Sequence, residues 1–277
     1  MEFLFSGFAD EAGRTIEEQM DVLEKNGVKY IEMRQVDGKH ILQWDDEAYS
    51  VIKEKMDKRG FKLSAIGSPV GKSKIEDSFD DELARFKKAV HAAKFFGCKY
   101  IRAFSFFVPK ESPREKYWNE AVSRVKELVA IAKDNDVVYA LENESGIFTD
   151  TLSNCVDFLN EIDSPAICVA FDPGNFIHNK TKPYPDAFNA LRDKIGYFHI
   201  KDAKDGKFVP AGEGESDMAS LLADAYKSGF NGFLSLEPHL GYLKDLTKAQ
   251  QFTTACNALK KCLNEGLNTS FEIVDPV

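Results

Sequence analysis

The feature of this chain that most constrains its fold is a regular alternation between apolar runs and amphipathic segments. Apolar runs of strand length recur eight times, at residues 3–8, 30–33, 62–66, 100–104, 137–141, 167–171, 196–200 and 232–236. Segments of helical periodicity follow them, at residues 15–25, 46–59, 80–96, 118–133, 152–162, 185–194, 218–227 and 248–264. This alternation is typical of βα units that share one parallel sheet.

Glycines close several of the helical segments, including Gly27, Gly60, Gly97 and Gly229. Glycine is favoured just past a helix because it adopts the left-handed conformation without steric cost. Eight units of roughly 30 residues fit a (β/α)8 barrel. A doubly wound open sheet is the alternative, but no G-x-G-x-x-G follows the first apolar run. The pattern therefore favours an α/β fold with a single (β/α)8 TIM barrel.

No Pro/Gly/Ser-rich linker divides the chain, so we expect residues 1–277 to form one barrel domain, with a short C-terminal tail after about residue 266. The longest connection, residues 105–117, mixes aromatic residues, prolines and charges. It joins a strand to its helix on the face where barrel enzymes carry their sites. The sequence leaves open whether this loop is a lid or a surface excursion.

Composition narrows the partners that we expect. The net charge is −9 and the pI is about 5.2, which argues against a nucleic-acid or anionic-membrane partner. The chain has no apolar run of membrane-spanning length and no recognisable signal peptide. Its five cysteines are scattered without a C-x-x-C pair, as in a reducing compartment. We therefore expect a cytoplasmic protein with a small-molecule partner, and the sequence leaves a homo-oligomer open.

Polar residues stand at corresponding places where the last four apolar runs end. They are Glu142, Asp172, His199 and Glu237, which are 30, 27 and 38 residues apart, and Asp202 is the alternative to His199. The C-terminal ends of barrel strands share one rim, so these side chains can converge. Three carboxylates and one imidazole suit a divalent cation of the manganese, magnesium or cobalt type, with zinc as a further option. The alternatives are solvated loop acids and a core histidine.

Several motifs, in order, carry a family resemblance: "YIEMR", "ALENESG", "FDPGNF", "YFHIKDAK", "GEGE" and "LSLEPH". The ordered set resembles the xylose isomerase-like TIM barrel superfamily of sugar phosphate isomerases and epimerases, in particular the ketose 3-epimerase, hydroxypyruvate isomerase and inosose dehydratase branch. The resemblance implies that Glu142, Asp172, His199 and Glu237 are metal ligands. It also implies that Glu142 and Glu237 exchange protons with the substrate carbon from opposite faces of the sugar.

The sequence departs from the epimerase pattern at three positions. Asn175 and Glu144 stand where relatives often have histidine, and Asp205 stands where they often have arginine. These departures argue against a standard ketohexose epimerase. The remaining polar residues near the predicted rim are expected to contact substrate, and the full set is Glu32, Arg34, Glu144, Asn175, Lys201 and His239. Lys201 has an alternative role in a salt bridge to Glu237 or Asp172, and Glu32 and Arg34 have one as a pair.

We therefore expect a divalent-metal-dependent sugar isomerase or epimerase, with manganese as the first expectation for the metal. A carboxylate would remove a proton from a ketose or polyol and leave a metal-bound enediolate. Expulsion of a β-hydroxyl from the same site would instead make the protein a dehydratase of a keto-sugar or inosose. A non-catalytic sugar-binding barrel is a further alternative. A nuclease on the same barrel is disfavoured because the chain has only five histidines and no basic stripe for DNA.

Overall fold

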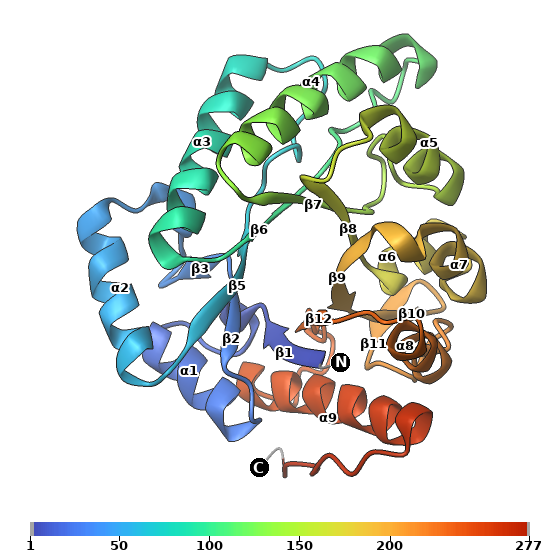
Figure 1. The fold of residues 1–277 in the computed structure, drawn as a ribbon. Coiled ribbons are helices and arrows are strands. Elements are labelled where there is room, and N and C mark those ends of the chain that lie inside the picture. Colours follow the sequence, from blue (N-terminus) through green and yellow to red (C-terminus); the bar gives the residue numbers. More distant parts are fainter. Residues whose placement is uncertain (1–2, 276–277) are drawn as a thin grey trace.

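A computed structural model describes residues 3–275 of the chain. Eight parallel strands form one sheet in the order β1-β12-β9-β8-β7-β6-β5-β2. A parallel bridge between Phe8 and Glu32 joins the two outer strands, and Figure 1 shows the resulting ring. The fold is the TIM barrel that the alternation predicts. Its strands are β1 (Phe3–Gly7), β2 (Tyr30–Met33), β5 (Lys62–Gly67), β6 (Tyr100–Ala103), β7 (Val138–Glu142), β8 (Ile167–Phe171), β9 (Ile195–Ile200) and β12 (Gly232–Leu236).

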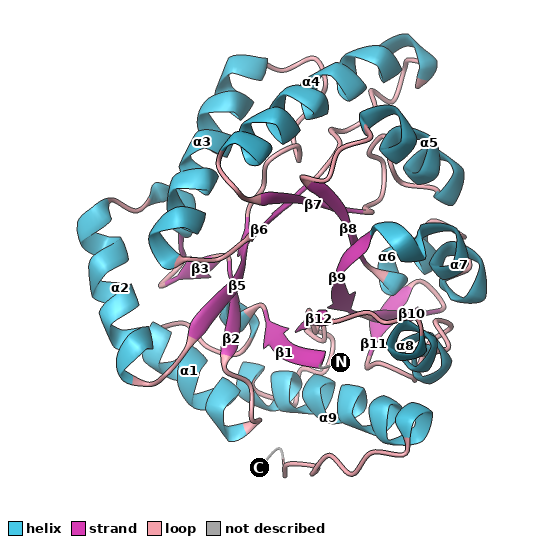
Figure 2. Cartoon of the chain, in the orientation of Figure 1, coloured by secondary structure: helices cyan, strands magenta, loops and turns pink. Residues whose placement is uncertain are grey.

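Helices surround the ring of strands, as Figure 2 shows. The main ones are α1 (Ile16–Lys25), α2 (Asp46–Lys58), α3 (Phe79–Phe96), α4 (Glu115–Asp134), α5 (Leu152–Ile162), α8 (Met218–Lys227) and α9 (Lys248–Leu267). Their ends carry the signals that the sequence predicts. Thr15 and Glu18 form a capping box at the start of α1, and Gly97 ends α3 in the left-handed conformation. Within residues 3–275, none of the helices combines the length and apolar character needed to cross a membrane.

The helix predicted at residues 185–194 is present, although its type changes along its length: η3 (Pro183–Ala187) is a π-helical turn, α7 (Phe188–Leu191) is α-helical and η4 (Arg192–Lys194) is a 3₁₀ turn. The backbone is non-helical at Tyr184, so Pro185 stands at the start of the helix, where proline fits because its ring meets no preceding turn. Additional short elements are present that the sequence pattern does not predict. They are η1 (Ala9–Glu11), η2 (Ile41–Gln43), α6 (Pro173–His178) and two hairpins, β3 (Gln35–Val36) with β4 (Lys39–His40) and β10 (Asp202–Lys204) with β11 (Lys207–Val209).

Small side chains make room inside the barrel for one large aromatic ring. Ala65, Ala140 and Ala170 pack around Tyr197, which is 1% exposed. Large and small side chains that complement each other in this way fill the interior at the density typical of protein cores. The barrel is therefore a filled core, and its polar residues are concentrated at the C-terminal ends of the strands.

The C-terminal segment after α9 lies along that helix, as Figure 1 shows. The side chain of Asn257 donates to the carbonyl of Val274 and accepts from its amide, at 2.6 and 2.9 Å. The ring of Phe271 lies 5.3 Å from that of Phe5 on β1. These contacts hold the segment at the outer surface of the barrel, away from the C-terminal ends of the strands.

Candidate metal centre

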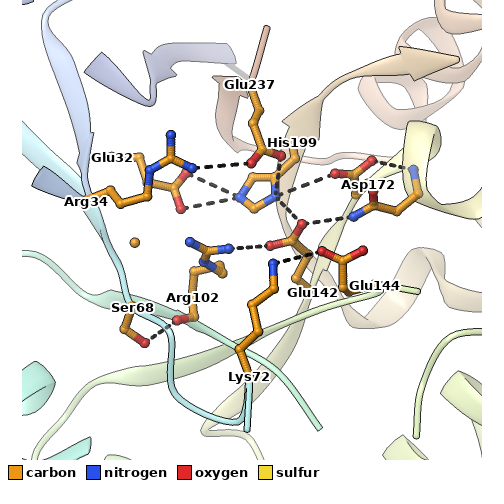
Figure 3. Close-up of polar contacts among 12 residues, drawn as sticks. Glu32, Arg34, Ser68, Lys72, Arg102, Glu142, Glu144, Asp172, His199 and Glu237 are labelled. Atoms are coloured by element: carbon orange, nitrogen blue, oxygen red, sulfur yellow. Dashed lines mark hydrogen bonds and ion pairs between the residues drawn. The ribbon is translucent and has the colours of Figure 1, made fainter. Parts of the chain in front are cut away.

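Four neighbouring strands bring together Glu142, Asp172, His199 and Glu237. Glu142 is the last residue of β7, Asp172 and Glu237 directly follow β8 and β12, and His199 lies in β9. None of the four is more than 3% exposed. One possible ligand atom from each residue lies within 4.8 Å of those of the other three. Figure 3 shows the three carboxylates around the imidazole ring.

One buried atom in this cluster, Nδ1 of His199, has no hydrogen-bond partner, whereas Oδ2 of Asp172 forms an ion pair with Nζ of Lys201 at 2.8 Å. The Nδ1 atom lies 3.5 Å from Oε1 of Glu142, 4.0 Å from Oδ2 of Asp172 and 4.0 Å from Oε2 of Glu237. Ligand atoms about 2.0–2.2 Å from a shared ion lie roughly 3–4 Å from one another. Buried polar atoms seldom lack a partner, so the donor set and its spacing fit a divalent cation.

The electrostatic environment gives the carboxyl groups of Glu142 and Asp172 different pKa values. Burial raises the pKa of Glu142, but the positive charges of His199 and Arg102 outweigh it and lower the pKa to about 2. Burial raises the pKa of Asp172 to about 7, an effect that the Lys201 ammonium opposes and the neighbouring carboxylates strengthen. Glu142 is therefore ionised at neutral pH, whereas Asp172 binds a proton as the pH falls through about 7.

Lys201 carries a buried ammonium at the edge of the cluster. Its Nζ lies 2.8 Å from Oδ2 of Asp172 and 2.7 Å from Oε2 of Glu237, and the residue is 3% exposed. Burial lowers the pKa of Lys201, but these carboxylates more than reverse the effect and raise it above its ordinary value. This is the salt bridge that the sequence offers as the alternative to substrate binding. The same position also allows Nζ to donate to a substrate oxygen.

Asn175 and Asn143 hold the ends of β7 and β8 together. The side-chain amide of Asn175 donates to Oε1 of Glu142 at 3.0 Å and to the carbonyl of Asn143 at 2.9 Å. Asn143 in turn exchanges two hydrogen bonds with the backbone of Asp172, which caps α6. Asn175, expected from the sequence to contact substrate, is 2% exposed and contacts Glu142. The two asparagines orient the carboxylates.

Arg102 belongs to the site, although it is not among the residues predicted from the sequence. It lies in β6, is 6% exposed, and its Nη1 donates to Oε2 of Glu142 at 3.0 Å. The rings of Phe8 and Phe104 lie 5.3 and 4.7 Å from its guanidinium carbon. The signal available in the sequence is the single arginine inside the apolar run YIRAF. A buried charge of this kind requires a partner, which here is Glu142.

Arg34 and His239 border Glu237 on its other side. Nη1 of Arg34 lies 3.9 Å and Nε2 of His239 lies 3.4 Å from Oε1 of Glu237. Glu11 contacts both side chains, at 3.3 Å from Arg34 and 3.4 Å from His239. Asp10 accepts from Nε of Arg34 at 2.8 Å. The side chains of Arg34 and His239 are 26% and 35% exposed, so this side of Glu237 is open to solvent.

Glu144 lies at the outer edge of the rim. Its side chain is 22% exposed and forms a 3.0 Å ion pair with Lys72, which is visible in Figure 3. Lys72 Nζ also lies 4.7 Å from the centre of the Phe104 ring. The pair spans from the β5–α3 connection to the β7–α5 connection. Glu144 therefore faces a lysine that the sequence analysis does not connect with it.

Glu32 occupies a different place from the one expected for a substrate contact. It is 0% exposed, and its carboxylate lies 3.3 Å from Nε2 of His199, on the ring edge opposite the cluster. Arg34, two residues later, contacts Asp10 and Glu11 and not Glu32. The suggested pair between Glu32 and Arg34 is absent among the described residues, because Arg34 lies past the end of β2 and reaches the rim.

The loop at residues 105–117 is fixed at several points. Val108 donates its amide to the carbonyl of Gly146 at 2.9 Å. Arg114 donates to both carboxylate oxygens of Asp150, at 2.9 and 2.8 Å. Both hydrogen bonds come from the single nitrogen Nη2, and charge-assisted bonds of this kind are stronger than neutral ones. These hydrogen bonds attach the loop to the β7–α5 connection. The attachment favours the interpretation of the loop as a surface excursion over that of a lid.

Asp202, the alternative to His199 in the sequence, anchors the loop that follows β10 and β11. Its carboxylate accepts from the amides of Ala203, Gly212, Gly214 and Ser216, at 2.8, 3.0, 3.1 and 3.1 Å. The loop passes so close that a Cβ added to Gly214 would lie 2.1 Å from Oδ1 of Asp202. Asp202 therefore organises the turn instead of entering the cluster.

Comparisons with known proteins agree on the fold. Residues 20–262 match the xylose isomerase-like TIM barrel family. The crystal structure of the IolI protein with a bound zinc atom is 20% identical, with a TM-score of 0.80 over 97% of this chain and 100% of that chain. The probable 3-DHS dehydratase AsbF from Bacillus anthracis is 19% identical, with a TM-score of 0.74 over 91% and 97%. A D-tagatose 3-epimerase-like protein is 16% identical, with a TM-score of 0.78 over 96% and 99%.

Proposed function

The chain belongs to the xylose isomerase-like TIM barrel family, and from that premise we propose that it is a divalent-metal-dependent isomerase or epimerase of a small sugar or polyol. The observation that carries the proposal is the buried Nδ1 of His199, which has no hydrogen-bond partner and faces carboxylate oxygens of Glu142, Asp172 and Glu237. Three carboxylates and one imidazole favour manganese as the first metal to test, with magnesium, cobalt and zinc as alternatives.

A divalent cation held by these four residues would act as a Lewis acid on adjacent carbonyl and hydroxyl oxygens of the substrate. Glu237 is placed to take the proton from the neighbouring C–H group. Its Oε2 is held by Lys201, and its Oε1 faces the solvent-accessible side beside Arg34 and His239. Removal of the proton leaves an enediolate, whose negative charge the ammonium of Lys201 stabilises.

Glu142 is the second proton carrier in this proposal. Arg102 and Asn175 hold its two carboxylate oxygens in fixed positions, and it stays ionised because its pKa is lowered to about 2. A proton returned to the opposite face of the same carbon gives epimerisation. A proton returned to the adjacent carbon gives isomerisation. The two glutamates lie on separate strands, β7 and next to β12, so they approach a bound substrate from different directions.

Dehydration of a keto-sugar or inosose is the second candidate, and the buried ammonium of Lys201 favours it. After Glu237 takes the C–H proton, a β-hydroxyl can leave only if it receives a proton or equivalent charge stabilisation. Nζ of Lys201, 2.7 Å from Glu237 and 2.8 Å from Asp172, is a buried donor at this position. The C–O bond breaks, the hydroxyl leaves as water, and a carbon–carbon double bond forms.

The residues expected to contact substrate divide into two groups. Arg34, His239 and Lys201 border the carboxylates directly, so we propose that they donate to substrate oxygens. Glu144, paired with Lys72, stands at the outer edge, where it would contact the distal end of a longer substrate.

Exchange of substrate protons with solvent tests the proposal. Protein dialysed against a chelator and then reloaded with Mn²⁺ is incubated in D2O with a panel of ketoses, inososes and hydroxy-acids, and the products are followed by NMR. We expect metal-dependent deuterium incorporation at one carbon. Glu237→Gln should lower the rate by about 10²–10⁴-fold, the usual contribution of a general base. Glu215→Gln, a change at an exposed loop carboxylate, is the matched control. Turnover that does not depend on metal would contradict the proposal.

A further inference from the structure

A carboxylate beneath the four candidate metal ligands has no role in the proposed reaction. Glu32 lies inside the barrel, and His199 separates it from the other acids, as Figure 3 shows. Its two oxygens each lie 3.3 Å from Nε2 of His199. The hydroxyl of Ser235 donates to Oε2 of Glu32 at 2.7 Å. No arginine or lysine forms an ion pair with Glu32 among the described residues, and its contacts with donor groups are those with Ser235 and His199.

This contact decides which nitrogen of His199 bears hydrogen. A neutral imidazole has a hydrogen on one ring nitrogen and a lone pair on the other. A carboxylate only accepts, so Glu32 requires the hydrogen on Nε2, and the lone pair is then on Nδ1. That is the atom without a hydrogen-bond partner, and it faces Glu142, Asp172 and Glu237.

Two aromatic rings keep the imidazole from turning over. The ring of Phe8 meets it edge-on with centroids 5.3 Å apart, and that of Tyr197 does so at 5.7 Å. Both rings are at most 1% exposed, so they are held by the packed interior. The orientation of His199 is therefore set from two sides by packing and from below by Glu32.

Glu32 itself is held by a layer of buried hydroxyl groups. Ser6, Ser235 and His199 are in register on the neighbouring strands β1, β12 and β9. Ser6 contacts Ser64 at 2.5 Å, Ser64 contacts the hydroxyl of Tyr197 at 2.8 Å, and Tyr197 also hydrogen-bonds to Ser235. All of these hydroxyl residues are at most 1% exposed. The layer leads to Glu32, whose Oε2 accepts from Ser235.

We propose that Glu32 is a positioning residue that fixes the Nε2–H tautomer of His199, so that Nδ1 is the metal ligand and the buried serine–tyrosine layer supports the metal centre from below. This inference deepens the proposed function, on whose metal site it rests, and it makes no use of the substrate. It replaces the substrate contact expected for Glu32 from the sequence, because a residue with 0% exposure beneath His199 does not reach the open rim.

Metal affinity is the first test. Isothermal titration of the chelator-treated protein with Mn²⁺ and Zn²⁺ compares wild type with Glu32→Gln. Glutamine keeps the size of the side chain, but its amide can donate to Nε2 and so favour the wrong tautomer. We expect the Kd to rise by about 10–100-fold, as for other partners of ligating histidines. The matched control is Glu82→Gln, which alters another carboxylate, 2% exposed, that accepts from the amide of Gly71 and pairs with Arg85 instead of with a residue of the cluster. Its Kd should not change.

The tautomer is the second test, because a merely structural role would not alter it. Long-range ¹H–¹⁵N correlation of the Zn²⁺-loaded, ¹⁵N-labelled protein distinguishes the two tautomers of each of the five histidines. We expect hydrogen on Nε2 of His199 in the wild type and a changed pattern in Glu32→Gln. An unchanged Kd in Glu32→Gln, or hydrogen on Nδ1 of His199, would overturn the inference alone. Failure of the wild type to bind any of the metals would overturn both the inference and the proposed function.

Discussion

The two halves of the barrel rim contribute differently to the same site: one supplies the four clustered residues and Lys201, and the other supplies two arginines. Strands β7, β8, β9 and β12 carry the carboxylates and the histidine in or just after them, whereas the arginines are Arg102 in β6, which pairs with β7, and Arg34 just past β2. Arg102 contacts Glu142 at 3.0 Å, and Arg34 approaches Glu237 at 3.9 Å. The first contact is almost completely buried, and the second is partly open to solvent.

This difference shows how the protein tolerates buried acids. A carboxylate removed from water without a partner is costly, so a cluster of acids needs cations from elsewhere in the fold. Arg102 supplies one where no water reaches, and Arg34 supplies another where solvent also contributes. The energetic importance of the two arginines should therefore differ, although both face a glutamate of the same cluster.

Loss of Arg102 should have the largest effect on stability. Arg102→Met leaves Glu142 buried with one oxygen unpaired, and we expect the metal-free protein to lose about 3–5 kcal/mol of unfolding free energy in a denaturant titration. The double variant Arg102→Met, Glu142→Gln should recover most of this loss, since the uncompensated charge is gone. Arg124→Met removes an arginine that pairs with the half-exposed Glu120 and is the control. Equal losses in the two single variants would contradict the prediction.

Loss of Arg34 should have a smaller effect. Its side chain is 26% exposed and contacts Asp10 and Glu11 as well as Glu237. Hydrogen bonds to charged groups contribute about 1.5–3 kcal/mol, and we expect Arg34→Met to fall at the lower end because water can solvate the carboxylates left behind. The same denaturant titration provides the measurement. A loss of unfolding free energy as large as that of Arg102→Met would mean that solvent reaches the Arg34 contact no better than the Arg102 contact.

Metal affinity should depend on pH through Asp172. Its pKa is raised to about 7, first by burial, whereas ligation to a metal requires the ionised carboxylate. Below pH 7 the metal must displace this proton, so affinity increases as the pH rises, by about tenfold per pH unit for each proton released. Burial lowers the pKa of His199, but Glu32 and Glu142 raise it well above its usual value, so its proton is displaced at higher pH as well.

The measurement is the Kd for Mn²⁺ between pH 5.5 and 8. The plot of log Kd against pH should be steeper below pH 7 than above it. In Asp172→Asn the change of slope near pH 7 should disappear, although the affinity itself is lower. A wild-type plot of constant slope through pH 7 would show that Asp172 binds no proton in this range.

Loss of the outer ion pair should have the smallest effect. Lys72 and Glu144 are 40% and 22% exposed, and exposed ion pairs contribute about 0–1 kcal/mol. Lys72→Met should therefore change unfolding free energy by less than about 1 kcal/mol and leave the Kd for Mn²⁺ unchanged. A large change in metal affinity would extend the functional cluster to the edge of the rim.

Much of the fold is readable from the sequence because its signals are local. Each strand of the barrel coincides with an apolar run, and most helix ends carry a cap or a glycine that marks them. The helix predicted at residues 185–194 is also present and begins at Pro185, but the change of helix type along it leaves no mark in the periodicity. The hairpins β3–β4 and β10–β11 have strands of two or three residues, which are too short for a periodic pattern to show.

The site is readable to the extent that strand order determines it. Glu142, Asp172, His199 and Glu237 stand at or near the C-terminal ends of neighbouring strands, and the barrel brings them to one rim. The order of the strands does not tell how far below the rim a side chain lies inside the barrel. Alternation indicated one side for Glu32 and Arg34, but Glu32 lies beneath His199, next to a register shift in β2. Arg102 could not be predicted from a local pattern, because its partner Glu142 is 40 residues away and the pairing of β6 with β7 brings the two together.

The anchoring of the loop by Asp202 has a consequence for how the protein can be altered. Four backbone amides are tied to one carboxylate, and Gly214 has no space for a side chain, so the path of the loop is fixed. Between these points, the side chains of Glu213 and Glu215 are exposed. Randomising those two positions would change the chemistry of the loop without moving its backbone. A library built there would sample new surfaces on the face where barrel enzymes recognise substrates, at little cost in folding.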